Sequence, residues 1–176
     1  MKIPAHFPRG IHNRLLPIAT GALMLGASAA HAEVLLHAQN SATITPINAA
    51  TNLIIGGATT FSFTVPGTSF ARVMIVFDSE CGVGGATTNR LDLDILLDPA
   101  GGTTTFSPIA PGSSSFTTPL CSGDGTASNS DSLITSSMVV VANVPPGTSQ
   151  LQVRATPTAG SVGPGRIGAR TLVVTR

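Results

Sequence analysis

The sequence predicts an all-β protein, a single antiparallel two-sheet sandwich of jelly-roll type with about eight or nine strands. Three observations support this prediction. Apolar and polar residues alternate in short runs, and turn residues separate these runs at fairly even spacing. No segment keeps the period of an amphipathic helix. The chain is also rich in Thr, Ser and Val and poor in helix formers, which favours strands.

The first 32 residues have the pattern of an export signal. A basic head with three positive charges and no acid comes first, an apolar run follows over residues 15–30, and alanines flank His31. The apolar run is shorter than the roughly 20 residues of a spanning helix. We therefore predict a signal peptide over residues 1–32, a secreted or periplasmic protein, and no membrane span after cleavage.

Residues 33–176 have the length of one domain, and no internal repeat or long linker divides them. All eight acidic residues lie in this part, together with six of the nine basic residues and no lysine. Binding of nucleic acid depends on clustered lysine and arginine, so the composition argues against a nucleic-acid partner. The same shortage of basic residues disfavours an anionic membrane surface.

The predicted strands begin with a lead-in strand over residues 33–45. Two short strands follow at 52–55 and 60–65. In the second of these, Phe61 and Phe63 alternate with polar residues, so one face is expected to be buried and the other to face water.

Residues 71–78 are expected to form a central strand because both faces are apolar. A glycine-rich loop is expected at 82–88. The strand predicted at 90–97 has the cleanest alternation, with aliphatic residues on one side. A turn is expected after it, because Pro99 presets one dihedral angle and Gly101 can take a positive φ.

Further strands are expected along the rest of the chain. Short extended pieces are predicted at 103–106 and 113–117, a polar loop at 121–132, and strands at 133–144, 149–156 and 165–176.

Cys81 and Cys121 are the only cysteines of the chain, and both lie after the predicted signal. An even number of cysteines in an oxidising compartment predicts a disulfide bond between them. We expect this bond to join the end of a central strand to a long loop. Closing a loop of this length contributes about 4 kcal/mol in the chain-entropy model.

The acidic residues suggest a metal site. Asp92 and Asp94 share one strand face, and Asp98 opens the next turn. Carboxylate oxygens are suitable ligands for calcium, so these three are the calcium candidates. The other interpretation is that they are solvated edge residues, paired with Arg72 or Arg90.

A second acidic group, formed by Asp124, Asn129 and Asp131, has a similar composition. Neither group has the spacing of an EF-hand loop. No other cofactor is predicted.

Four segments between residue 73 and the end of the chain form a pattern. They are the aromatic–x–x–Glu–Cys step at 77–81, the strand of alternating acids and aliphatic residues at 91–98, Cys121, and the closing residues 172–174. In these segments the chain resembles small exported bacterial β-sandwich proteins of unassigned activity. The resemblance implies strands and a disulfide, and it transfers no catalytic residue to this chain.

Side chains for covalent catalysis are scarce. His37 is the only histidine after the predicted signal, lysine is absent there, and no Gly-x-Ser-x-Gly motif occurs. The glycines at 82, 84 and 85 precede a predicted strand, whereas a phosphate-binding loop leads into a helix.

We therefore predict a non-catalytic exported protein, a structural or binding module of the bacterial envelope or extracellular space. Its partner would be a second copy, an extracellular glycan or an extracellular protein. One alternative is a calcium-dependent carbohydrate-binding module, although the chain lacks the Trp and Tyr that commonly stack on sugars. A third hypothesis is a hydrolase with a pair of carboxylates.

Overall fold

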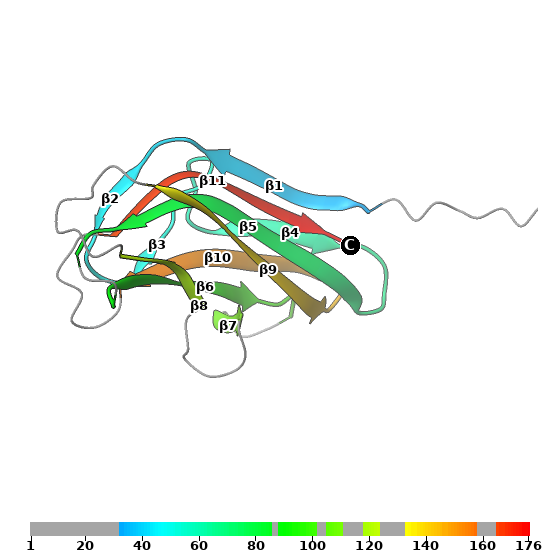
Figure 1. The fold of residues 1–176 in the computed structure, drawn as a ribbon. Coiled ribbons are helices and arrows are strands. Elements are labelled where there is room, and N and C mark those ends of the chain that lie inside the picture. Colours follow the sequence, from blue (N-terminus) through cyan, green and yellow to red (C-terminus); the bar gives the residue numbers. More distant parts are fainter. Residues whose placement is uncertain (1–31, 86–87, 102–104, 111–117, 124–132, 158–164) are drawn as a thin grey trace, which may run out of the picture. The chain divides into compact units, whose positions relative to one another are not determined.

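The structure is a computed structural model that describes residues 32–85, 88–101, 105–110, 118–123, 133–157 and 165–176. In these residues the chain forms eleven strands and no helix, arranged as two antiparallel sheets (Figure 1). This confirms the all-β prediction, with more strands than the eight or nine expected. Residues 1–31, which carry most of the predicted signal peptide, lie outside the described part.

The first sheet, called sheet A here, has five strands, with β5 and β11 at its centre. Its strands are β1 (Val34–Asn40), β11 (Gly165–Thr175), β5 (Ala71–Val83) and β9 (Ile134–Val144) in that order, with β2 (Ile44–Ile47) paired to β11 beside β1. The central position predicted for the strand that begins at Ala71 is confirmed, because β5 pairs with β11 on one side and β9 on the other.

The second sheet, called sheet B, has six strands, and β10 and β6 pair at its centre. Its members are β3 (Thr51–Asn52), β4 (Phe61–Val65), β6 (Arg90–Asp98), β7 (Ser107–Ala110), β8 (Thr118–Ser122) and β10 (Gly147–Pro157). Strands β3 and β4 pair with the other side of β10, and β7 and β8 with the other side of β6.

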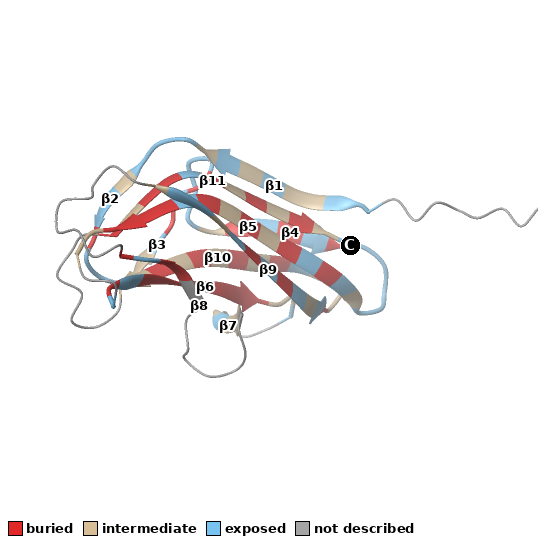
Figure 2. Ribbon diagram, in the orientation of Figure 1, coloured by how far each residue is buried: buried red, intermediate tan, exposed pale blue. Residues whose placement is uncertain are grey.

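One apolar core lies between the two sheets, and the buried residues of both contribute to it (Figure 2). The alternation predicted at residues 60–65 is confirmed, because Phe61, Phe63 and Val65 are buried and the residues between them are exposed. Burial of an aliphatic or phenyl side chain contributes about 1.5–3 kcal/mol. The core, and not backbone propensity alone, therefore determines which face of each strand points inward.

Several boundaries differ from those predicted. The lead-in segment forms two strands, β1 and β2, separated by a bend at Ala42. Strand β5 continues to Val83, because Gly82 and Val83 still pair with β11, so the expected loop begins later. Part of the extended pieces predicted at 103–106 and 113–117 lies outside the described residues, and the strands β7 and β8 begin further along the chain.

The tight connections follow the turn chemistry of the sequence. Gly101 has a φ of 77° after Pro99, as the predicted turn requires. Strands β9 and β10 are joined by two prolines, and Gly147 after them has a φ of 108°. Within the described residues, no helix has the length and apolar character needed to cross a membrane.

Candidate functional site

The three calcium candidates lie on one face of β6, which is an interior strand of sheet B. Asp92, Asp94 and Asp98 alternate with the leucines and isoleucine that enter the core. All three are buried, with at most 8% of their surface exposed. The interpretation of these acids as solvated edge residues is therefore wrong, because β6 has neighbouring strands on both sides.

Two arginines pair with these acids. Arg154 on β10 donates to Asp94 Oδ2 from Nη2 at 2.7 Å and from Nε at 3.2 Å. The Nε atom of Arg90 lies 3.0 Å from Asp92 Oδ1, which agrees with the predicted pairing of Arg90. The alternation along one strand does not reveal Arg154 as a partner, because only the register of β10 against β6 places it opposite Asp94.

The row of acids is extended rather than convergent. Residues two apart on a strand are about 7 Å apart, so Asp94 and Asp98 are separated by roughly 13 Å along β6. Within the described residues, no group of three or more His, Cys, Asp or Glu side chains is close enough to hold a metal ion. Calcium binding by these acids stays a prediction. The second acidic group, Asp124, Asn129 and Asp131, lies outside the described residues.

The ion pair between Asp94 and Arg154 is expected to stabilise the fold. The variant D94N removes the charge from a buried carboxylate that receives two hydrogen bonds, so we expect the free energy of unfolding to fall by about 1–2 kcal/mol. Urea denaturation of D94N, R154M and the double variant measures this loss and the coupling between the two residues. Strictly additive losses would contradict a direct interaction.

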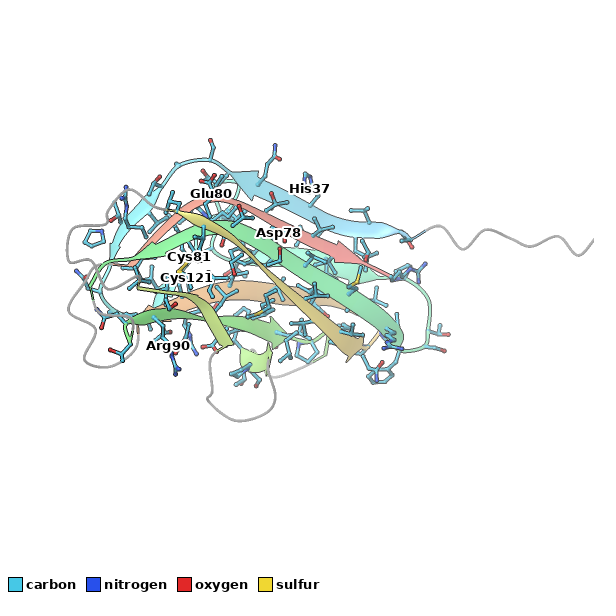
Figure 3. The ribbon with its side chains drawn as sticks, in the orientation of Figure 1. His37, Asp78, Glu80, Cys81, Arg90 and Cys121 are labelled. Carbon is cyan, nitrogen blue, oxygen red and sulfur yellow. A yellow bond between two sulfur atoms is a disulfide. The ribbon has the colours of Figure 1, made fainter. Side chains whose placement is uncertain are left out.

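The predicted disulfide is present and joins the two sheets. Cys81 on β5 and Cys121 on β8 are bonded, with their Cα atoms 6.0 Å apart (Figure 3). Both cysteines are buried. Cys121 lies inside a short strand and not in the loop that the sequence suggested. Beside it, the hydroxyl of Ser136 on β9 donates to the carbonyl of Leu120 at 2.7 Å, which adds a second link between the sheets.

A polar pocket of about 510 Å³ opens where β1, β11 and the turn at 56–57 meet. Gln39, Asn40 and Thr171 supply polar side chains to its wall, and Arg170 also lines it. The volume is within the range of small-molecule sites. Its character depends on whether the charge of Arg170 is available to a ligand.

The guanidinium of Arg170 is bound to backbone carbonyls. It donates to Ile54 O from Nε at 2.7 Å and also from Nη2, and from Nη1 to Ala42 O at 2.6 Å and to Gly168 O at 2.8 Å. Arg170 is only 3% exposed. Burial lowers the pKa of Arg170, because desolvation disfavours the charged form. Arg170 therefore holds two loops onto β11, and most of its donors are occupied.

The sequence contains a signal for this buried arginine, although Arg170 is not among the predicted site residues. Residues two apart on a strand point to the same face, so Arg170 is expected on the same face as Leu172 and Val174, which are buried in the core. An arginine at an inward position of an alternating strand is expected to have dedicated partners, because an unpaired buried charge is costly.

His37 lies exposed on β1 and is displayed at the outer face of sheet A (Figure 3). The acids of β5 have other partners. The carboxylate of Asp78 accepts a hydrogen bond from the Ser137 hydroxyl, and Glu80 Oε2 accepts one from the backbone N–H of Ala169 at 3.2 Å. This arrangement favours a surface role for His37 over a role as a general base.

An apolar patch crosses the outer face of sheet A. It consists of Met74 and Val76 on β5, Val139 and Val141 on β9, and Val173 on β11. Val141 lies opposite Met74, and Val139 lies opposite Val76, which in turn lies opposite Val173, so the five side chains are contiguous. Val139 is 58% exposed, Val141 48% and Met74 42%, whereas Val76 and Val173 are half-buried. Contiguous apolar surface of this kind marks contact sites.

The patch ends at an open strand edge. Strand β9 is eleven residues long, and among the described residues it pairs with β5 alone. Its sequence, ITSSMVVVANV, has no ionisable side chain and no proline. Natural sheets usually protect long edges with charges, prolines or bulges, and β9 has none of the first two.

No protein-family model and no curated protein sequence matches the chain. Among solved structures, the chain is similar to one of infectious bursal disease virus, strain Gt, at 16% identity and a TM-score of 0.40, over 83% of this chain and 33% of that one. A VP2 subviral particle of the same virus gives 16% identity and a TM-score of 0.41 over the same shares. The chain is also similar to dimeric latent PorU from Porphyromonas gingivalis, at 12% identity and a TM-score of 0.38, over 84% of this chain and 14% of that one. The chain therefore spans about a third of the viral proteins and a smaller part of PorU.

Proposed function

We propose that this protein is an exported, non-catalytic β-sandwich that serves as a structural or binding module of the bacterial envelope or extracellular space. The observation that carries the proposal is the apolar patch on sheet A, which reaches the uncharged edge of β9. Such a surface has no role in the core of the molecule, and its composition is that of the centre of a protein interface.

The surroundings of the ionisable groups support the non-catalytic part of the proposal. A general acid or base needs a carboxylate or imidazole that is open to a substrate. Among the described residues, Asp94 is bound to Arg154, and Asp92 is paired with Arg90. Arg170 is bound to backbone carbonyls. These groups are therefore engaged in holding strands and loops together.

The disulfide supports export. Disulfides such as the one between Cys81 and Cys121 form and persist in oxidising compartments and are rare in the cytosol. The basic and apolar pattern of residues 1–32 provides the corresponding export signal.

The export part is tested by the intact mass of the native protein. The full chain is produced in a bacterium and recovered from the periplasm or the medium without reducing agent. We expect a chain that begins at Glu33 and lacks two hydrogens because of the disulfide. In the control variant A30D/A32D, cleavage should fail, because the small residues at the cleavage site are lost. A full-length cytosolic protein with two free thiols would contradict the proposal.

The contact part is tested by the native size of the exported protein in the unpurified extract. We expect the wild type to elute above the monomer mass and the variant V139S/V141S, which removes apolar surface at exposed positions, to elute as a monomer. Wild type that elutes as a monomer in the extract at every protein concentration would contradict a role in assembly or binding through this patch.

A further inference from the structure

We propose that the partner at the apolar patch is a second copy of this chain, joined by antiparallel pairing of β9 with β9 of its partner across a two-fold axis at Val139. This inference rests on the proposed function and names the partner for it. The result would be one continuous sheet in which β9 is no longer an edge.

Strand β9 offers the longest such edge among the described residues. The opposite edge of sheet A is β1, with seven residues, and the edge strands of sheet B have two to five. Strand β9 has eleven, and no ladder partner on its outer side is described. A long, uncharged edge presents a row of backbone donors and acceptors to an added strand.

The register follows from symmetry. Paired residues of two antiparallel strands point to the same face, so a two-fold axis perpendicular to the sheet must lie midway between one residue and its own copy, and that residue pairs with itself. The middle residue of Ile134–Val144 is Val139. An axis there pairs every residue of β9. Val139 then lies opposite its own copy, with Ser137 opposite Val141 and Met138 opposite Val140.

This register also matches the two faces of the strand. Met138 and Val140 are buried and face the core, and in the pair they would meet each other on the inner side. On the outer side, Val139 and Val141 of each copy would form one apolar stripe that continues to Met74. The patch of one copy is thereby extended by the patch of the other.

The charge pattern points to a second copy rather than to a different protein. At a two-fold axis each residue meets its own copy or a near neighbour, so an ionised residue close to the axis would meet a like charge. Strand β9 has no ionisable residue, whereas its neighbour β5 carries Arg72, Asp78 and Glu80. A partner of different sequence would permit charges on β9, provided that it carried the opposite ones.

Two other arrangements would use nearby surface and give different results. Stacking of two sheets face to face would use Met74 as much as Val139. Head-to-tail pairing of β9 with β1 of the next copy has no two-fold axis and would give rings or open polymers instead of a dimer.

The decisive measurement is sedimentation equilibrium of the purified, oxidised protein with the variants V139K and M74K. Both residues are exposed on the same face, so both variants should keep the fold, which their unfolding curves verify. We expect a finite monomer–dimer equilibrium for the wild type. V139K should raise the dissociation constant at least about 100-fold, because two lysines meet at the axis. M74K should change it less than about 3-fold, because its charge lies away from the axis.

Equal loss in both variants would overturn the proposal in favour of stacked faces, and rings or open polymers would overturn it in favour of head-to-tail pairing. A purified wild type that stays monomeric, although the exported protein is part of a larger complex in the extract, would overturn this inference and leave the proposed function standing. An unprocessed protein with free thiols would instead remove the proposed function.

Cross-linking gives an independent test of the register. Under mild oxidation V139C should form a disulfide-linked dimer, because the paired Cα atoms would be about 5 Å apart. The matched variant M74C should remain unlinked, since two copies of β5 would be separated by three strand spacings, about 14 Å. Linkage of M74C with no linkage of V139C would contradict pairing at the edge.

Discussion

Replacement of both cysteines by alanine is expected to lower the free energy of unfolding by about 4 kcal/mol. The disulfide joins residues 40 positions apart, and its loss restores the corresponding conformational freedom to the unfolded chain. A loss of this size is a large fraction of the stability of a typical domain. Guanidinium denaturation of C81A/C121A and of the wild type measures it.

The bond links the two sheets of the folded protein. Cys81 lies in sheet A and Cys121 in sheet B, and each is buried. The matched control is the wild type under reducing conditions, which should lose a similar amount while keeping both sulfur atoms. Equal stability of the oxidised wild type and C81A/C121A would contradict a stabilising role for the bond.

The variant R170M is expected to lose about 3 kcal/mol of unfolding free energy. It leaves the carbonyls of Ala42, Ile54 and Gly168 without the donors that Arg170 supplies. A buried carbonyl without a partner costs about 1–3 kcal/mol, which applies to the buried Gly168, whereas Ala42 and Ile54 are exposed residues, where water replaces part of the lost bonds. Burial lowers the pKa of Arg170, so methionine also removes a desolvation cost, which keeps the net loss below the sum of the three. Urea denaturation of R170M beside the wild type measures the loss.

Two further variants separate this role from a general effect of charge. R170K keeps a positive charge but lacks the planar group that reaches several carbonyls at once, so it should be intermediate. R72M changes an exposed arginine on β5 and should alter the stability by less than about 0.5 kcal/mol. If R170M and R72M have the same stability, the bonds of Arg170 contribute nothing.

Alternation is the most informative signal for the fold. The residues that it places inward, such as Phe63 in β4 and Leu93 in β6, are buried in the core. This succeeds because one face of each strand must leave water, and that requirement is local in sequence. The bounds are harder to predict, since they depend on pairing with distant segments. Strand β5 extends past Cys81 because β11 pairs with it there.

The surroundings of the acids depend on information that one strand does not contain. The acidic row that includes Asp94 is visible in the sequence, but the burial of Asp94 results from the neighbours of β6. Its partner Arg154 lies 60 residues away. By contrast, the disulfide can be predicted without knowing the strand register, because two cysteines allow only one pairing.

The sequence predicts that strand edges take part in assembly, but it does not predict which strand and which residues form the contact surface. The uncharged composition of the strands suggests assembly through open edges, and residues 133–144 are predicted as a strand. That this strand is an edge, and that Val139 and Val141 point outward beside Met74, follows from the order of strands in sheet A. Strand order depends on the whole topology.

The most direct test of the proposed edge pairing is the amide hydrogen-exchange rate of β9, measured at increasing protein concentration. In a lone sandwich, only the amides of β9 that bond to β5 are protected, and the outward amides exchange freely. We predict that peptides covering residues 134–144 gain protected amides as the concentration rises, whereas the exposed β1 edge does not. Exchange in β9 that is identical from dilute to concentrated solution, together with a constant monomer mass, would contradict the pairing of two β9 strands.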